Sequence, residues 1–180
     1  MFRLDLDGRW TLAWCEPGVG EVRGWPEAGP AGVRLVEATV PGDVHVDLIE
    51  AGLIDEPLYG QNTPDCRWVE ERDWWYARSF DLPADAIGGR VELHFGGLDC
   101  TADVWLNGAH LGRTNNANIP HTLDATAAVR SGLNRRIAVA AATSVVIVCV
   151  ALFAFFWPVL AASPLTYEQW QTRIWFDNWV

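Results

Sequence analysis

The side chains that most often bind metals or act as nucleophiles are widely separated in this sequence. None of the four cysteines belongs to a Cys-X-X-Cys pair, so their spacing supports neither a zinc site nor a thioredoxin-like redox motif. The four histidines have no second metal-type ligand at helical or hairpin spacing, and we expect structural roles for them. The sequence therefore predicts no metal site and no cofactor. The residues concerned are Cys15, Cys66, Cys100, Cys149, His45, His94, His110 and His121.

The composition argues against two broad classes of protein. The chain has 180 residues, a formal net charge of −10, and 13 basic residues, all of them Arg. We expect no nucleic-acid partner, because a phosphate-binding surface needs clustered Lys or Arg. Half of the residues are hydrophobic and 11 are Trp, so we expect a packed core rather than intrinsic disorder. At roughly 150 residues per domain, the length predicts one domain plus an appendage.

The first two-thirds of the chain has the pattern of short β-strands. In Arg90–Gly97 and Ala102–Asn107, apolar residues alternate with polar ones, which is typical of strands with one buried face. Asn107-Gly108 then predicts a hairpin, because a type I′ turn needs positive φ at both central positions. The return strand is Ala109–Gly112. Further predicted strands are Gly8–Trp14 and Asp73–Phe80.

These strands predict a mainly β fold. Short strands with turn signals about every ten residues favour an antiparallel β-sandwich or jelly roll, here over residues 1–139. One short helix is expected at Val44–Ala51, where Asp43 is a plausible N-cap. Residues Ile137–Ala140 are needed both by the last strand and by the apolar segment that follows, which leaves the completeness of that strand open.

An uncharged segment runs from Ile137 to Tyr167. Within it, Ala141–Ala162 is long enough, as a helix, to cross a bilayer core of about 30 Å. We therefore predict a single transmembrane helix in contact with membrane lipid, followed by a short aromatic tail at 163–180. A buried helix in a soluble protein is the alternative, but a small β-domain offers no second apolar layer to surround it.

The flanking charges predict an orientation for this span. Arg130, Arg135 and Arg136 precede it and only Arg173 follows it, a bias that keeps the N-terminal domain cytoplasmic. The acidic N-terminus, which lacks the apolar core of a signal peptide, favours the same location. Without the tail, the expected location is also cytoplasmic.

A series of motifs runs in a fixed order through residues 3–139. It comprises Leu6–Trp10, Val40–His45, Pro57–Asn62, Trp74–Tyr76, Phe95–Asp99, Ala102–Gly108 and Pro120–Thr126. This order resembles the N-terminal sugar-binding domain of glycoside hydrolase family 2, and β-mannosidases most closely. The resemblance implies a jelly-roll, galactose-binding-like fold and a β-mannoside or another sugar as ligand.

The resemblance also bears on catalysis. Retaining glycosidases use two carboxylates about 5 Å apart, and in family 2 both are Glu residues on a C-terminal (β/α)₈ barrel. The 180 residues leave no room for that barrel, so we predict no catalytic residue. The expected function is a non-catalytic carbohydrate-binding domain, truncated before the barrel and tethered to a membrane. The alternatives are a fragment or chimera of a β-mannosidase without independent activity, and an accessory part that complements a separate barrel.

The jelly roll of such enzymes lends one loop to the sugar pocket. By the resemblance, Asn62, with Gln61 and Tyr59 beside it, is the candidate sugar contact, since an amide offers both a donor and an acceptor to neighbouring hydroxyls. A simple turn, in which Asn62 caps its own backbone, is the alternative. Trp74 and Trp105 could stack on a sugar ring or belong to the core, and the sequence favours the core.

The C-terminal segment has a resemblance of its own. Residues 140–180 are similar to the last transmembrane helix and C-terminus of an actinobacterial protein O-mannosyltransferase, on motifs such as Phe155–Leu160 and Arg173–Val180. None of the catalytic loops of those enzymes is matched, so transferase activity is not implied. The chain therefore reads either as a true fusion or as a join of two partial proteins.

Overall fold

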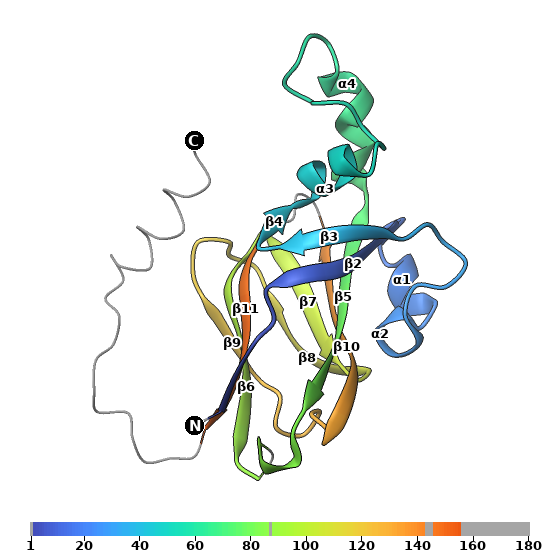
Figure 1. The fold of residues 1–180 in the computed structure, drawn as a ribbon. Helices are drawn as coiled ribbons and strands as arrows, with labels where there is room; N and C mark the ends of the chain where they lie inside the picture. The colour runs from blue at the N-terminus through green and yellow to red at the C-terminus, as the bar shows by residue number, and fades with distance from the viewer. Residues whose placement is uncertain (1, 87, 143–145, 156–180) are drawn as a thin grey trace.

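Two antiparallel β-sheets packed face to face make up the body of the molecule (Figure 1). The computed structural model describes residues 2–86, 88–142 and 146–155. In order across the six-stranded sheet, the strands are β3 (Val36–Val40), β2 (Gly8–Cys15), β5 (Asp73–Leu82), β10 (Gly132–Ala142), β7 (Thr101–Leu106) and β8 (Ala109–Thr114). The second sheet contains β1 (Phe2–Asp5), β11 (Val146–Phe155), β6 (Arg90–Leu98) and β9 (His121–Asp124), with β4 (Gly42–Asp43) paired to β11. The predicted antiparallel sandwich is confirmed.

The helices are short and lie outside the sheets. They are α1 (Val19–Val22), α2 (Trp25–Ala28), α3 (Val44–Glu50) and α4 (Thr63–Cys66), with 3₁₀ turns η1 (Arg67–Glu71) and η2 (Ala84–Ala86). The predicted helix after Asp43 is confirmed as α3. The carboxylate of Asp43 accepts a hydrogen bond of 2.7 Å from the backbone N–H of His45, which is the expected N-cap interaction.

The main core fills the space between the two sheets, and strand alternation explains its composition. On β6, Val91, Leu93 and Phe95 are fully buried while the residues between them are only partly buried. On β5, Trp74 and Tyr76 belong to this core. The alternative of a sugar-stacking role for Trp74 is therefore excluded in favour of packing.

A second cluster covers the outer face of the six-stranded sheet. The indoles of Trp75 and Trp105 stack with centroids 5.2 Å apart, and Trp25 of α2 meets Trp75 edge-on at 5.6 Å. Trp105 is 6% exposed and thus also part of a core. A side chain at Gly20 would collide with the ring of Trp75, so α1 lies directly against this cluster.

The predicted hairpin is confirmed between β7 and β8. Asn107 and Gly108 both have positive φ, 52° and 87°, as a type I′ turn requires. The Asn107 side chain donates to the carbonyl of Ala128 at 2.9 Å and to the Oδ1 of Asn134 at 3.0 Å. The hairpin is thus tied to the loop that precedes β10 and to the start of β10 itself.

The transmembrane helix predicted over Ala141–Ala162 is wrong for the part that the structure describes. Ala141 and Ala142 are the end of β10, and Val146–Phe155 form β11. β11 lies between β1 and β6, with Leu152 opposite Leu4 on one side and Leu93 on the other. The physical reason is that an uncharged, Val-rich run suits a central strand as well as a membrane helix.

The prediction of lipid contact through residues 141–162 rested on a helix in this segment. Because residues 146–155 form a strand, the prediction loses its basis as far as Phe155. Among the residues that the structure describes, no helix has both the length and the apolar composition needed to span a bilayer. The rest of the predicted span and the tail at 163–180 lie outside the described residues. The motifs on which the similarity to a transferase terminus was based, Phe155–Leu160 and Arg173–Val180, lie outside the described residues except for Phe155.

Candidate sugar-binding loop

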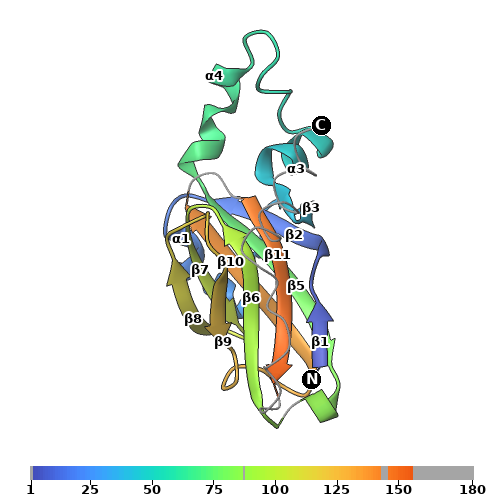
Figure 2. The same cartoon turned by 90° about the vertical axis from the view of Figure 1, so that its left-hand side faces the viewer.

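The three predicted sugar-contact residues lie on one loop at an end of the sandwich. This loop, residues 52–62, connects α3 to α4 and projects beyond the two sheets, as Figures 1 and 2 show. Tyr59 is 77% exposed, Gln61 is exposed and Asn62 is half-buried. What the loop can bind depends on how its two ends and its tip are held.

The N-terminal end of the loop is held by Asp47 of α3. Its carboxylate is 3% exposed and accepts hydrogen bonds from the backbone N–H of Thr39 at 3.0 Å and from the hydroxyl of Tyr76 at 3.5 Å. Burial raises the pKa of Asp47 from its ordinary 3.8 to about 6, and the hydrogen bond from Thr39 opposes this rise. Asp47 thus joins α3 to β3 and β5.

The raised pKa of Asp47 predicts a pH-dependent stability. Between about pH 4 and about pH 6 the folded chain holds a proton that the unfolded chain has lost, so the free energy of unfolding should fall by about 3 kcal/mol as the pH rises through this range. Asp47→Asn keeps an acceptor for Thr39 and removes the charge. Urea titrations at several pH values should show a weaker pH dependence in the variant, and an unchanged slope would contradict the assignment.

The C-terminal end of the loop is held by aromatic packing. Trp68 of η1 lies 5.9 Å, between ring centroids, from both Trp14 and Trp74. The indole N–H of Trp74 donates to the carbonyl of Val69 at 2.9 Å. With both ends fixed on the sandwich, the loop tip has a defined position.

The tip is closed by hydrogen bonds to its own backbone. The Asn62 amide nitrogen donates to the carbonyl of Glu56 at 3.0 Å, and the Thr63 hydroxyl donates to the carbonyl of Pro57 at 2.7 Å. The nitrogen of the Asn62 amide therefore has the structural role that we expected if residues 62–64 were a simple turn. Among the described residues, none donates a hydrogen bond to its Oδ1, so the other half is available to a ligand.

A charged pair lies at the base of α3. The pKa of His45 is raised, first by its hydrogen bond to Asp43 at 3.1 Å and further by the charges of Asp43, Glu70 and Glu56. Burial raises the pKa of Asp43, but the hydrogen bonds from His45 outweigh it and the pKa is lowered. Both shifts favour the ionised forms of the pair.

The arrangement offers binding groups rather than reactive ones. The phenol of Tyr59 and the amides of Gln61 and Asn62 supply uncharged donors and acceptors, which suit sugar hydroxyls. The structural roles of Glu56 and Thr63 were not predicted, because they depend on the loop conformation. The adjacent Thr63-Pro64 pair, typical of a turn, was the available signal.

A family model described as "Glycosyl hydrolase 2 galactose-binding domain-like" matches residues 23–148. The chain belongs to this family. Among curated relatives, it is 35% identical over 131 residues to a β-mannosidase of Rattus norvegicus, a match that covers 72% of this chain and 15% of that protein. It is 36% identical over 98 residues to a probable β-mannosidase of Caenorhabditis elegans, covering 53% of this chain and 11% of the relative.

Solved structures agree with this assignment. The β-D-mannosidase of Dictyoglomus thermophilum superposes with a TM-score of 0.65 and 30% identity, covering 78% of this chain and 15% of that one. A β-glucuronidase of Ruminococcus gnavus shares the fold, with a TM-score of 0.61 at 18% identity, over 84% of this chain and 28% of that one. The chain thus spans only a small part of these relatives, and it is a sugar-binding-like domain of the β-mannosidase type.

Proposed function

We propose that this chain is a non-catalytic carbohydrate-binding domain that recognises β-mannosides through the tip of its 52–62 loop. The observation that supports this most strongly is the combination of an exposed Tyr59 and Gln61 with an Asn62 whose Oδ1 has no donor among the described residues. The similarity to β-mannosidases supports the choice of sugar.

The expected affinity is low. A few hydrogen bonds from an exposed loop support dissociation constants in the range of about 1 mM or weaker. This suits a domain that adds contacts to a sugar bound mainly elsewhere. The hydrolytic carboxylates would then belong to a barrel domain, in line with the small share of each relative that this chain spans.

A complementing role is the second candidate, favoured by the apolar tip of the loop. Leu58 is 92% exposed and is followed in the loop by Tyr59, which is 77% exposed. Large exposed apolar side chains side by side often mark a protein contact. In this role the loop would dock against a separate barrel and complete its sugar pocket.

Calorimetry with methyl β-D-mannoside tests the binding proposal on the full chain. Tyr59→Ala should weaken binding at least about fivefold, because a loss of roughly 1 kcal/mol is typical for one stacking or hydrogen-bonding contact. This variant is informative because Tyr59 makes no side-chain hydrogen bond within the described structure that its removal would break. Asn62→Ala should weaken binding to a similar extent.

Asn118→Ala is the matched control, since Asn118 is exposed on a different loop and should bind sugar like the parent chain. Equal binding by the parent and by both loop variants would contradict the proposal. Release of nitrophenol from a nitrophenyl β-mannoside should not be detected with the chain alone, and turnover would show that it is itself an enzyme.

A further inference from the structure

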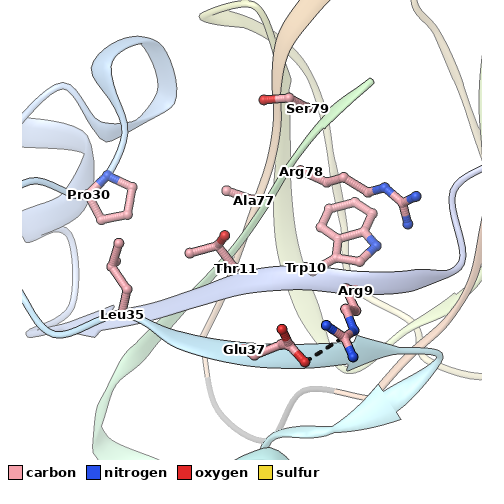
Figure 3. A pocket seen from close by; sticks show the side chains of 9 residues that line it. All are labelled: Arg9, Trp10, Thr11, Pro30, Leu35, Glu37, Ala77, Arg78 and Ser79. Carbon is pink, nitrogen blue, oxygen red and sulfur yellow. Dashed lines mark ion pairs between the residues drawn. The ribbon is translucent and has the colours of Figure 1, made fainter. Parts of the chain in front are cut away.

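The outer face of the six-stranded sheet differs between the two ends of β2. Arg9 and Cys15 lie at opposite ends of this strand and point to the same face, because every second side chain of a strand does so. At the Arg9 end, a pocket of about 420 Å³ is open, and the charges of Arg9 and Glu37 balance there (Figure 3). At the Cys15 end, α1 and the cluster of Trp25, Trp75 and Trp105 cover the face.

The covered end contains a buried hydrogen-bond donor without an ordinary acceptor. Trp75 is 2% exposed, and no described residue accepts a hydrogen bond from its indole Nε1. Gly20 of α1 packs over this nitrogen so closely that a Cβ at position 20 would collide with it. Burying an unpaired N–H is costly, so an oxygen acceptor placed beside it would be favoured.

The sulfur of Cys15 faces this donor. Ala13 is paired with Trp75 and Cys15 with Asp73, which sets Cys15 and Trp75 diagonally opposite each other on one face. Cys15 is half-buried against the tryptophan cluster. The indole of Trp75 and the backbone N–H of Gly20 both interact with the sulfur, but sulfur is only a weak acceptor. The thiol therefore leaves the Trp75 donor largely unsatisfied.

The surroundings keep Cys15 protonated at neutral pH. Burial raises the pKa of the thiol above its ordinary value of 9.0, and the charge of Asp73 adds to the rise. The N–H groups of Gly20 and Trp75 and the charge of Arg23 oppose the rise without cancelling it. Because the thiolate is the reactive form, oxidation of Cys15 should be slow at neutral pH and faster in alkali.

We propose that Cys15 is an oxidation site, which a hydroperoxide converts to a long-lived sulfenic acid. The sulfur attacks one peroxide oxygen, an S–O bond forms and the O–O bond breaks. The thiol proton passes to the leaving oxygen, which departs as water or an alcohol. The sulfur is oxidised by two electrons and the peroxide is reduced by two. The new oxygen accepts hydrogen bonds from Trp75 and Gly20, and the proposal does not rest on sugar binding.

Cys100 provides the contrast within the same chain. Sulfenic acids condense readily with other thiols, so a lasting one needs both protection and a hydrogen bond. Half-burial beside α1 protects Cys15, whereas Cys100 is exposed. The Cys100 sulfur lies 3.8 Å from the carbonyl of Asn115, which cannot donate to an added oxygen. A sulfenic acid on Cys100 should therefore be short-lived.

The indole region of a ¹⁵N NMR spectrum tests the proposal on the full chain. After treatment with hydrogen peroxide and removal of the excess by catalase, the Trp75 indole N–H signal should move downfield. Dithiothreitol should return it, and in Cys15→Ala peroxide should leave it in place. Mass spectrometry measures the added oxygen. An unmoved Trp75 signal in a chain that carries one oxygen on Cys15 would overturn the proposal, as would the failure of Cys15 to gain oxygen.

Delayed trapping with dimedone measures the lifetime of the sulfenic acid. When dimedone is added some time after the peroxide is removed, the label on Cys15 should exceed that on Cys100 several-fold. Trp75→Phe keeps an aromatic ring but lacks the donor, and should lower the Cys15 label about fivefold, as expected for one lost hydrogen bond. Trp105→Phe, which alters the same cluster and keeps the donor, is the matched control. Equal labelling of Cys15 and Cys100, or equal loss in both tryptophan variants, would overturn the proposal.

Discussion

Ala151→Pro should unfold the sandwich or lower its thermal midpoint by about 10 °C, because proline removes a ladder hydrogen bond from a central strand at a cost of about 3 kcal/mol. Position 151 lies opposite Asp5 of β1 and His94 of β6, so β11 has a partner on both sides there. Replacing alanine loses almost no apolar surface, which confines the effect to the backbone. Near-UV circular dichroism of the tryptophans would report the loss of packing.

Ala117→Pro is the control for this variant, since Ala117 lies in a turn outside the strands. It should melt within a few degrees of the parent chain. If Ala151→Pro melts like the parent as well, residues 146–155 do not complete the sheet. The membrane-helix interpretation of this segment would then regain support, because a helix outside the sandwich can be broken without unfolding it.

Asn134→Ala should destabilise the fold by about 3 kcal/mol, since it leaves several buried polar groups without partners. The Asn134 side chain is fully buried. Its Oδ1 accepts from the Arg130 N–H at 2.8 Å and from Asn107, and its Nδ2 donates to the carbonyls of Arg130 and Gly132 at 2.8 and 3.1 Å. Urea unfolding followed by tryptophan fluorescence measures the loss.

Asn134→Asp distinguishes this network from a simple effect of volume. A carboxylate keeps the size of the amide and can accept from Arg130, but it cannot donate to the two carbonyls and adds a buried charge. We expect it to be at least as unstable as Asn134→Ala at neutral pH and to recover partly in acid. An Asn134→Asp variant as stable as the parent would contradict the network, and Asn118→Ala should be neutral.

Local signals explain which elements the sequence could predict. The β7–β8 hairpin depended on Asn107 and Gly108, and α3 on the N-cap at Asp43; both are properties of a few neighbouring residues. The strands β6 and β7 alternate strongly enough to be recognised, and β5 is rich in aromatic residues that favour strands. Short elements such as β1 and β9, of four residues each, give too little pattern to detect.

The strand β11 shows where pattern reasoning fails. A continuous apolar run is compatible with a membrane helix and with a central strand. The deciding factor is that β1 and β6 need a strand between them to form one sheet, and β11 takes that position. This requirement is a property of the assembled sheet. The same limit applies to the candidate sugar-binding loop, because the Asn62 bond to Glu56 depends on the loop conformation.

The measurement that tests the central claim most directly is a ¹⁵N NMR titration of the full chain with methyl β-D-mannoside. If the domain binds the sugar through its loop, the amide signals of residues 59–62 shift together and saturate at millimolar concentrations. The signals of Thr11 and Ala77, which pair within the six-stranded sheet, stay in place. Loop signals that do not move at tens of millimolar sugar, or that move no more than those elsewhere, would contradict the account.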